Sequence, residues 1–197
     1  ATQEAHWLYL VYALTGAMID RFADPEAGGF FQSSITAEAL LTRRKEETDN
    51  ALPSGNSQAA LLLQRLGRLT GNSEWQALAE KWLRTQSSLM RRFPSSFGTL
   101  LQAAQQALHP GLDLCLIKGS EATEAEQLLE VIQQTYLPGS LFFTEKLALF
   151  AQADPSHLEG KIAQQGKATL YICQYGQCLP PVTSAVEAAT ALQKTAY

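Results

Sequence analysis

Three stretches of helical hydrophobic periodicity follow one another closely in this chain, and they constrain its fold more than any other feature of the sequence. In residues 57–69 leucine and alanine recur at intervals of three and four, and the same spacing returns in residues 75–83 and 97–108. Short links separate these stretches, and short links place successive helices antiparallel. Residues 57–108 are therefore predicted to form antiparallel helical hairpins.

A further amphipathic stretch over residues 4–22 precedes these helices and carries Trp7 and Leu14 on its apolar stripe. Pro25 ends it, because proline disfavours helical geometry in the residue before it. Trp7, like Trp75 and Trp82 in the later helices, is predicted to lie in the core.

The pattern changes at Gly111. Short apolar runs at residues 112–117, 141–144 and 169–173 are typical of buried strands, and a helix-start signal at Thr123 lies between the first two. A strand, a helix and a strand at this spacing predict a small parallel βαβ unit. The predicted fold is mostly α: residues 1–110 form helical hairpins, and residues 111–197 form a small α/β segment packed on them.

The composition excludes several classes of function. Hydrophobic residues make up 46% of the 197 residues and charged residues 17%, which is enough for a core. A net charge of −4 argues against a nucleic-acid or membrane-surface partner, since both require clustered Lys and Arg. There is no apolar run of the ~20 residues that a membrane span needs. Three cysteines without a signal peptide favour the cytoplasm, and a start at Ala1 instead of Met suggests a processed or excised chain.

Several segments resemble one known family. The segment GGFF (residues 28–31) and the segment RRKEETDNALPSGNSQAALLLQRLGRLTG (residues 43–71) resemble the YyaL-type, spermatogenesis-associated thioredoxin-domain-containing family. The later segments FPSSFGTLLQAAQQAL (residues 93–108) and GKATLYICQYGQCLPPV (residues 166–182) agree with it in order and spacing. The resemblance covers nearly the whole chain, and the motif DNALPSGNS is its most specific part.

The resemblance implies a longer parent protein with an N-terminal thioredoxin-like domain. Its body would be an (α/α)6 toroid, similar to N-acylglucosamine 2-epimerases and six-hairpin glycosidases, and this chain would be its C-terminal part. A section of such a toroid leaves helix faces that neighbouring helices would cover. The chain is therefore expected to pair with the missing N-terminal part of its parent or with a second copy of itself.

In a toroid of this kind the loops at one end line a central cup, which makes the polar stretch before residue 57 a candidate sugar site. Asp49, Asn50, Ser54 and Asn56 could hydrogen-bond sugar hydroxyls. The candidate site also includes basic residues for an anionic group and an aromatic platform at the mouth of the cup, namely Arg43, Lys45 and Phe30. The alternative is structural: Ser54 or Asn56 caps the following helix, and Asp49 favours its N-terminal dipole. The residues alone leave both interpretations open.

Other candidate chemistry is weaker. The histidines, His6, His109 and His157, are widely scattered, which favours surface or capping roles over catalysis. Cys173 and Cys178 would stand across a hairpin with a two-residue turn. Cross-strand β-carbons there lie ~4.5–5.5 Å apart, marginally far for a disulfide, so two reduced thiols are favoured over a redox pair. One cysteine pair does not provide the four ligands of a structural zinc site, and neither a metal nor a cofactor is predicted.

Two functions follow from these observations. In the first, the chain contributes a carbohydrate-binding or sugar-isomerising pocket, without a complete catalytic set, to a six-hairpin-glycosidase-like protein. In the second, it is a non-catalytic scaffold or interaction module that supports a redox domain elsewhere in the parent. Convergence of the loop residues on an open cup would favour the first, and their use in capping would favour the second.

Overall fold

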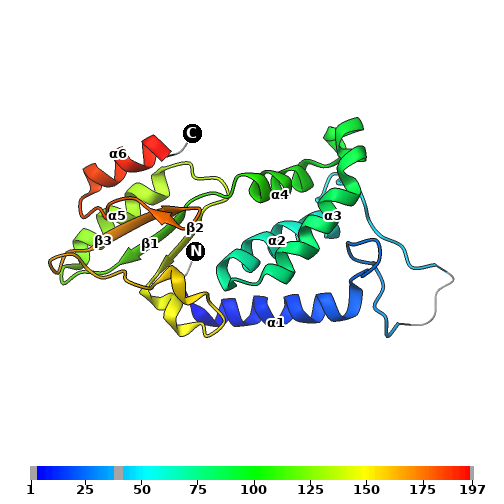
Figure 1. Cartoon of the computed structure of the whole chain (residues 1–197), viewed down its shortest axis with the longest axis horizontal. Coiled ribbons are helices and arrows are strands. Elements are labelled where there is room, and N and C mark those ends of the chain that lie inside the picture. Colours follow the sequence, from blue (N-terminus) through cyan, green and yellow to red (C-terminus); the bar gives the residue numbers. More distant parts are fainter. Residues whose placement is uncertain (1–3, 38–41, 196–197) are drawn as a thin grey trace. The chain divides into compact units, whose positions relative to one another are not determined.

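The computed structural model describes residues 4–37 and 42–195, which divide into two compact units (Figure 1). The helical unit comprises residues 7–109, and the mixed unit comprises residues 110–197 together with residues 1–6. The start at Ala1, from which processing was inferred, lies outside the described residues. The predicted fold class is confirmed, because the chain is mostly helical and a small mixed sheet lies in its C-terminal half.

The core of the helical unit forms where other helices pack around one central helix, α2 (Gly55–Thr70). Its elements, in chain order, are α1 (Ala5–Phe22), α2 (Gly55–Thr70), α3 (Ser73–Arg92), the 3-10 helix η1 (Pro94–Ser96) and α4 (Gly98–Leu108). α2 packs against both α3 and α4. Leu63 of α2 and Leu100 of α4 are fully buried.

Local capping explains where α2 and α3 begin and end. The Ser54 side chain accepts a hydrogen bond from the Ser57 amide and caps α2, while Gly71 closes α2 in the left-handed conformation, with φ of 65°. Asn72 caps α3 by accepting from the Trp75 amide. The two-residue link makes α2 and α3 an antiparallel hairpin.

α1 differs from the other helices of this unit because none of its apolar side chains is fully buried and several are exposed. Trp7 is 50% exposed and Leu14 is 60% exposed, so the prediction that Trp7 lies in the core was wrong. Trp75 and Trp82, by contrast, are buried as predicted. The described residues contain no helix with the length and apolar character to cross a membrane.

The mixed unit is a four-stranded sheet with helices. Its elements are β1 (Asp113–Ile117), α5 (Ala122–Gln134), β2 (Leu141–Thr144), the 3-10 helices η2 (Glu145–Leu149) and η3 (Pro155–His157), β3 (Thr169–Gln174), β4 (Gln177–Cys178) and α6 (Ala185–Thr195). The strand order is β2-β1-β3-β4. β1 and β2 are parallel and joined by α5, which is the predicted βαβ unit, whereas β3 runs antiparallel to β1.

The two faces of this sheet are covered differently. α5 and α6 pack against each other and cover the face that carries Leu114, Leu170 and Ile172 (Figure 1). On the other face the Tyr171 hydroxyl donates to the Ile162 carbonyl at 2.8 Å. Irregular chain between β2 and β3 thus contacts the second face.

We predict that Leu63→Ala destabilises the helical unit by about 2–5 kcal/mol, because it leaves a cavity where the side chain is fully buried. Leu52→Ala is the matched control, since Leu52 is 79% exposed and its loss should change stability by less than about 0.5 kcal/mol. Urea unfolding followed by tryptophan fluorescence reports on this unit, because all three tryptophans belong to it. Equal effects of the two substitutions would contradict the packing.

Candidate functional site

Asp49 joins the beginnings of two helices. One carboxylate oxygen accepts the Ser54 amide at 2.9 Å, at the start of α2, and the other accepts the Thr99 amide at 2.8 Å, in the first turn of α4. Burial alone would raise the pKa of Asp49, but these bonds and one from the Ser57 hydroxyl outweigh it and hold the pKa below its usual range. Both carboxylate oxygens therefore have partners within the chain.

Asn56 fastens the loop before α2 to the turn after α1. Its side-chain oxygen accepts the Phe30 amide at 2.6 Å, and its side-chain nitrogen donates to the carbonyls of Phe30 at 2.9 Å and Glu46 at 3.0 Å. The side chain thus pairs with the Phe30 backbone as a neighbouring strand would. Asn56 is 3% exposed, so this amide is buried and satisfied.

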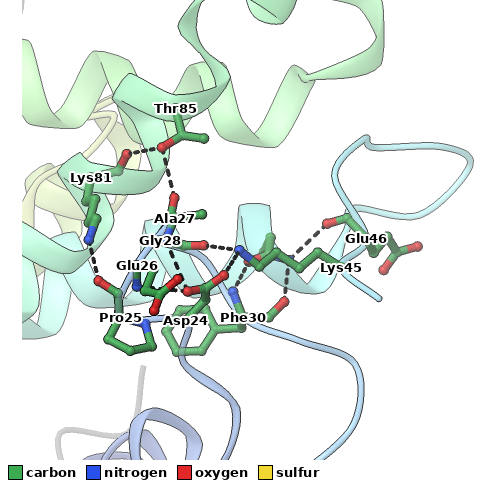
Figure 2. Close-up of polar contacts among 11 residues, drawn as sticks. Asp24, Pro25, Glu26, Ala27, Gly28, Phe30, Lys45, Glu46, Lys81 and Thr85 are labelled. Atoms are coloured by element: carbon green, nitrogen blue, oxygen red, sulfur yellow. Dashed lines mark hydrogen bonds and ion pairs between the residues drawn. The ribbon is translucent and has the colours of Figure 1, made fainter. Parts of the chain in front are cut away.

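Lys45 forms a largely buried ion pair with Asp24 (Figure 2). Its ammonium group lies 2.6 Å from the carboxylate and 2.6 Å from the carbonyl of Gly28, to which it also donates. The two side chains are only 11% and 13% exposed. Asp24 also accepts the amides of Glu26 and Ala27, and with the Lys45 bond as the largest cause its pKa falls to about 2.

Helix α3 holds the other side of the same turn (Figure 2). Lys81 donates to the carbonyl of Pro25, and Thr85 donates to the carbonyl of Ala27 at 3.0 Å. Gly29 has a φ of 72° and lies against the Trp82 ring, where a β-carbon would clash. The turn at residues 24–30 therefore needs glycine both for its backbone angle and for its close approach to α3.

Arg43 and Lys45 approach an aromatic ring that could otherwise have served as a sugar platform. The Arg43 guanidinium lies 4.0 Å from the centroid of the Phe31 ring, and the Lys45 ammonium lies 4.9 Å from it. Arg43 also donates to the carbonyl of Ser33 at 2.6 Å. These are cation–π contacts within the chain.

The structure brings the sequence-predicted site residues together, but it uses most of them internally. Ser54, Asn56 and Asp49 bond backbone amides, and Lys45 and Arg43 bond carboxylate and carbonyl oxygens. Phe30 contributes its backbone to Asn56 and is partly buried. The side chain of Asn50 is exposed, and its amide donates to the carbonyl of Leu52. The cap that Ser54 forms on α2 is one that the structural interpretation predicted.

Sequence reasoning missed the part played by α3. Lys81 and Thr85 lie 56 and 58 residues from the carbonyls to which they donate, so no local pattern could have identified them. The pairing of Asp24 with Lys45, 21 residues apart, likewise depends on the fold.

Cys173 and Cys178 form a disulfide with a Cα–Cα separation of 3.9 Å. The interpretation as two reduced thiols, based on an expected separation that was too long, is therefore corrected. The two-residue turn that sequence reasoning expected at Tyr175-Gly176 is present, with both residues at positive φ. The two strands approach more closely at this pair than the ~4.5 Å usual for directly opposed residues.

Two of the histidines have structural contacts. His6 lies 3.3 Å from the Glu4 carboxylate, and the His157 ring packs on Phe143 with 4.9 Å between centroids. Within residues 4–37 and 42–195, no group of three or more His, Cys, Asp and Glu side chains is placed to hold a metal ion.

Comparison with known proteins identifies relatives of this chain. Over 199 residues it is 30% identical to spermatogenesis-associated protein 20 of Mus musculus, and over 198 residues it is 29% identical to the Homo sapiens protein of that name. Each alignment covers 95% of this chain and 24% of the relative, so the chain spans about a quarter of the length of the curated relatives it matches. No protein-family model matches the chain. The resemblance found in the sequence is thus supported by homologues over almost all of the chain.

We predict that Asp49→Ala lowers the free energy of unfolding by about 1.5–3 kcal/mol, because it leaves the amides at the starts of two helices without their charged acceptor. Asn50→Ala, at the adjacent exposed position, should change it by less than about 0.5 kcal/mol. Urea titration at neutral pH measures both. A loss after Asn50→Ala as large as that after Asp49→Ala would show that the loop, and not the carboxylate, matters.

The Asp24–Lys45 pair predicts a specific pH dependence. A carboxyl whose pKa is lower in the folded state stabilises the fold above its unfolded pKa of 3.8, and this contribution disappears as pH falls towards about 2. The stability difference between the parent chain and Asp24→Asn should therefore stay constant above pH 5 and shrink between pH 4 and 2. Urea midpoints across this range test it, and a difference independent of pH would contradict the ion pair.

Proposed function

We propose that this chain is a non-catalytic scaffold module of a longer, thioredoxin-domain-containing protein similar to spermatogenesis-associated protein 20. The observation that carries the proposal is the internal use of the loop's polar groups. Asp49, Ser54 and Asn56 hold helix starts and a turn, and Lys45 is paired with Asp24. These contacts favour a structural role for the loop over a role as a sugar pocket.

The docking surface that we propose is the exposed apolar face of α1. Trp7, Leu10 and Leu14 lie at intervals of three and four residues, so they share one side of the helix. They are 50%, 48% and 60% exposed. Contiguous exposed apolar groups of this size mark interaction surfaces, since burying them against a partner removes apolar area from water.

The partner that we propose for this face is a helix from the remainder of the same polypeptide. The curated relatives are about four times as long as this chain, which covers 24% of them. An apolar stripe at helical spacing fits the groove of another helix. An (α/α)6 ring, in which hairpins such as α2–α3 stand side by side, would supply such a neighbour. The thioredoxin-like domain would then do its redox chemistry elsewhere in the protein.

Carbohydrate binding is the weaker alternative on this geometry. A sugar site needs donors and acceptors that are free to bond the ligand. Here the donors and acceptors of the loop bond backbone groups, and those backbone groups would lose their partners if a sugar took their place. Of the seven candidate residues, Asn50 is the one that is exposed.

Co-expression of the tagged chain with the polypeptide encoded upstream of it tests the scaffold proposal. We expect the two to copurify, and we expect Leu10→Gln with Leu14→Gln to abolish copurification, because these changes place amides in an apolar contact. The matched control is Leu52→Gln with Leu108→Gln, two leucines of the same unit that are 79% and 72% exposed.

Circular dichroism of both double variants shows whether they fold. Loss of copurification in the α1 variant alone supports the proposal. Copurification that survives the α1 substitutions, or that is lost equally in the control, contradicts docking through α1. A concentration-dependent dimer that persists in the presence of the upstream polypeptide would mean that a second copy is the partner.

A further inference from the structure

The disulfide in the mixed unit lies at the exposed end of a hairpin. β3 and β4 pair so that Cys173 stands opposite Cys178, and Gln174 stands opposite Gln177 next to the turn. Gly176 and Tyr175 both have positive φ, at 76° and 52°, as a two-residue hairpin turn requires. The turn therefore brings the two cysteines together whether or not their sulfurs are bonded.

The two cysteines differ in their access to solvent. Cys173 is 7% exposed, whereas Cys178 belongs to an exposed strand. A nucleophile from solution can reach the second residue much more readily than the first. Thiol–disulfide exchange depends on which sulfur is accessible to attack, so the structure selects Cys178 as the point of entry.

The bond can open without unfolding the sheet. It closes a loop with a sequence separation of only 5, and a disulfide restrains the unfolded chain least when its loop is short. β3 is held independently by its pairing with β1, and the Leu179 amide donates to the Ile172 carbonyl at 2.9 Å. Farther along, Val182 and Leu170 exchange two backbone bonds. Reduction should therefore loosen only the tip of the hairpin.

We propose that the Cys173–Cys178 disulfide is a thiol–disulfide exchange site for an external dithiol. The thiolate of the dithiol attacks the sulfur of Cys178, a mixed disulfide forms, and Cys173 leaves as a thiolate that takes up a proton. The second thiol of the dithiol, as a thiolate, then attacks the sulfur that the dithiol contributed to the mixed disulfide. Cys178 is released as a thiolate and takes up a proton. Two electrons pass to the cysteine pair, and the dithiol becomes a disulfide.

The third cysteine provides an internal standard for this reaction. Cys115 is fully buried in β1, and burial raises the pKa of its thiol to about 12. Because the thiolate is the reactive form, this thiol should not react with alkylating reagents in the folded protein. Its labelling therefore reports unfolding, whereas labelling of Cys178 reports opening of the disulfide.

Alkylation with iodoacetamide followed by peptide mass spectrometry tests the proposal on the whole chain. We expect no labelled cysteine in the air-oxidised folded protein, labelling of Cys178 after dithiothreitol without denaturant, and labelling of Cys115 only in urea. Circular dichroism should not change on reduction. If the disulfide resists dithiothreitol until Cys115 is also labelled, the bond is a structural one and the proposal is wrong.

Single-cysteine variants test which sulfur is attacked. Cys173→Ser leaves the exposed thiol of Cys178, and we expect it to gain one glutathione when the folded protein is treated with oxidised glutathione. Cys178→Ser is the matched control, and its buried Cys173 should gain none under the same conditions. Glutathione on Cys173 but not on Cys178 would overturn the proposed direction of attack.

Discussion

The helical unit depends on the two hydrogen bonds that the carboxylate of Asp49 accepts from backbone amides. The first amides of a helix have no partner within the helix, and the two helix starts that flank this carboxylate would each lose an acceptor without it. Asp49 accepts from Ser54 before α2 and from Thr99 in α4, and α2 packs directly on α4. One side chain therefore fixes the loop and also sets the relation between two core helices.

A loop rich in polar residues need not be a binding site, and this one shows why. The chain between α1 and α2 has to bring several irregular segments together, and each brings backbone groups that require partners. Asn56 supplies these for the turn at Phe30, and Lys45 supplies one for Gly28. Once these bonds are counted, Asn56, Lys45 and Asp49 have little hydrogen-bonding capacity left for a ligand. We therefore propose that recognition uses the apolar face of α1.

The sequence predicted the regular elements well because their signals are local. The spacing of Leu63 and its neighbours defined α2, and the alternation of short apolar runs with a helix defined the parallel pairing of β1 and β2. The exposure of Trp7 could not be predicted in the same way, because an apolar stripe has the same spacing whether its partner is present or absent. The Asp24–Lys45 pair likewise joins residues 21 apart and depends on the path of the loop.

The disulfide illustrates the same distinction between local and longer-range information. The turn at Tyr175-Gly176 was readable from the sequence, whereas the approach of Cys173 to Cys178 depended on how closely the two strands pair. A cysteine pair with one exposed member, on an otherwise well-held sheet, is compatible with a scaffold whose hairpin tip responds to thiols while its core stays intact.

The central claim is that the polar groups of residues 43–56 hold the chain itself and do not bind a ligand. The most direct test is to record the backbone amide resonances of Phe30, Ser54 and Thr99 by nuclear magnetic resonance, first during hydrogen exchange and then during titration with a panel of monosaccharides. The account predicts that these three amides exchange slowly and that their resonances do not move when sugar is added. Fast exchange at all three amides, or saturable shifts in the presence of a sugar, would contradict it.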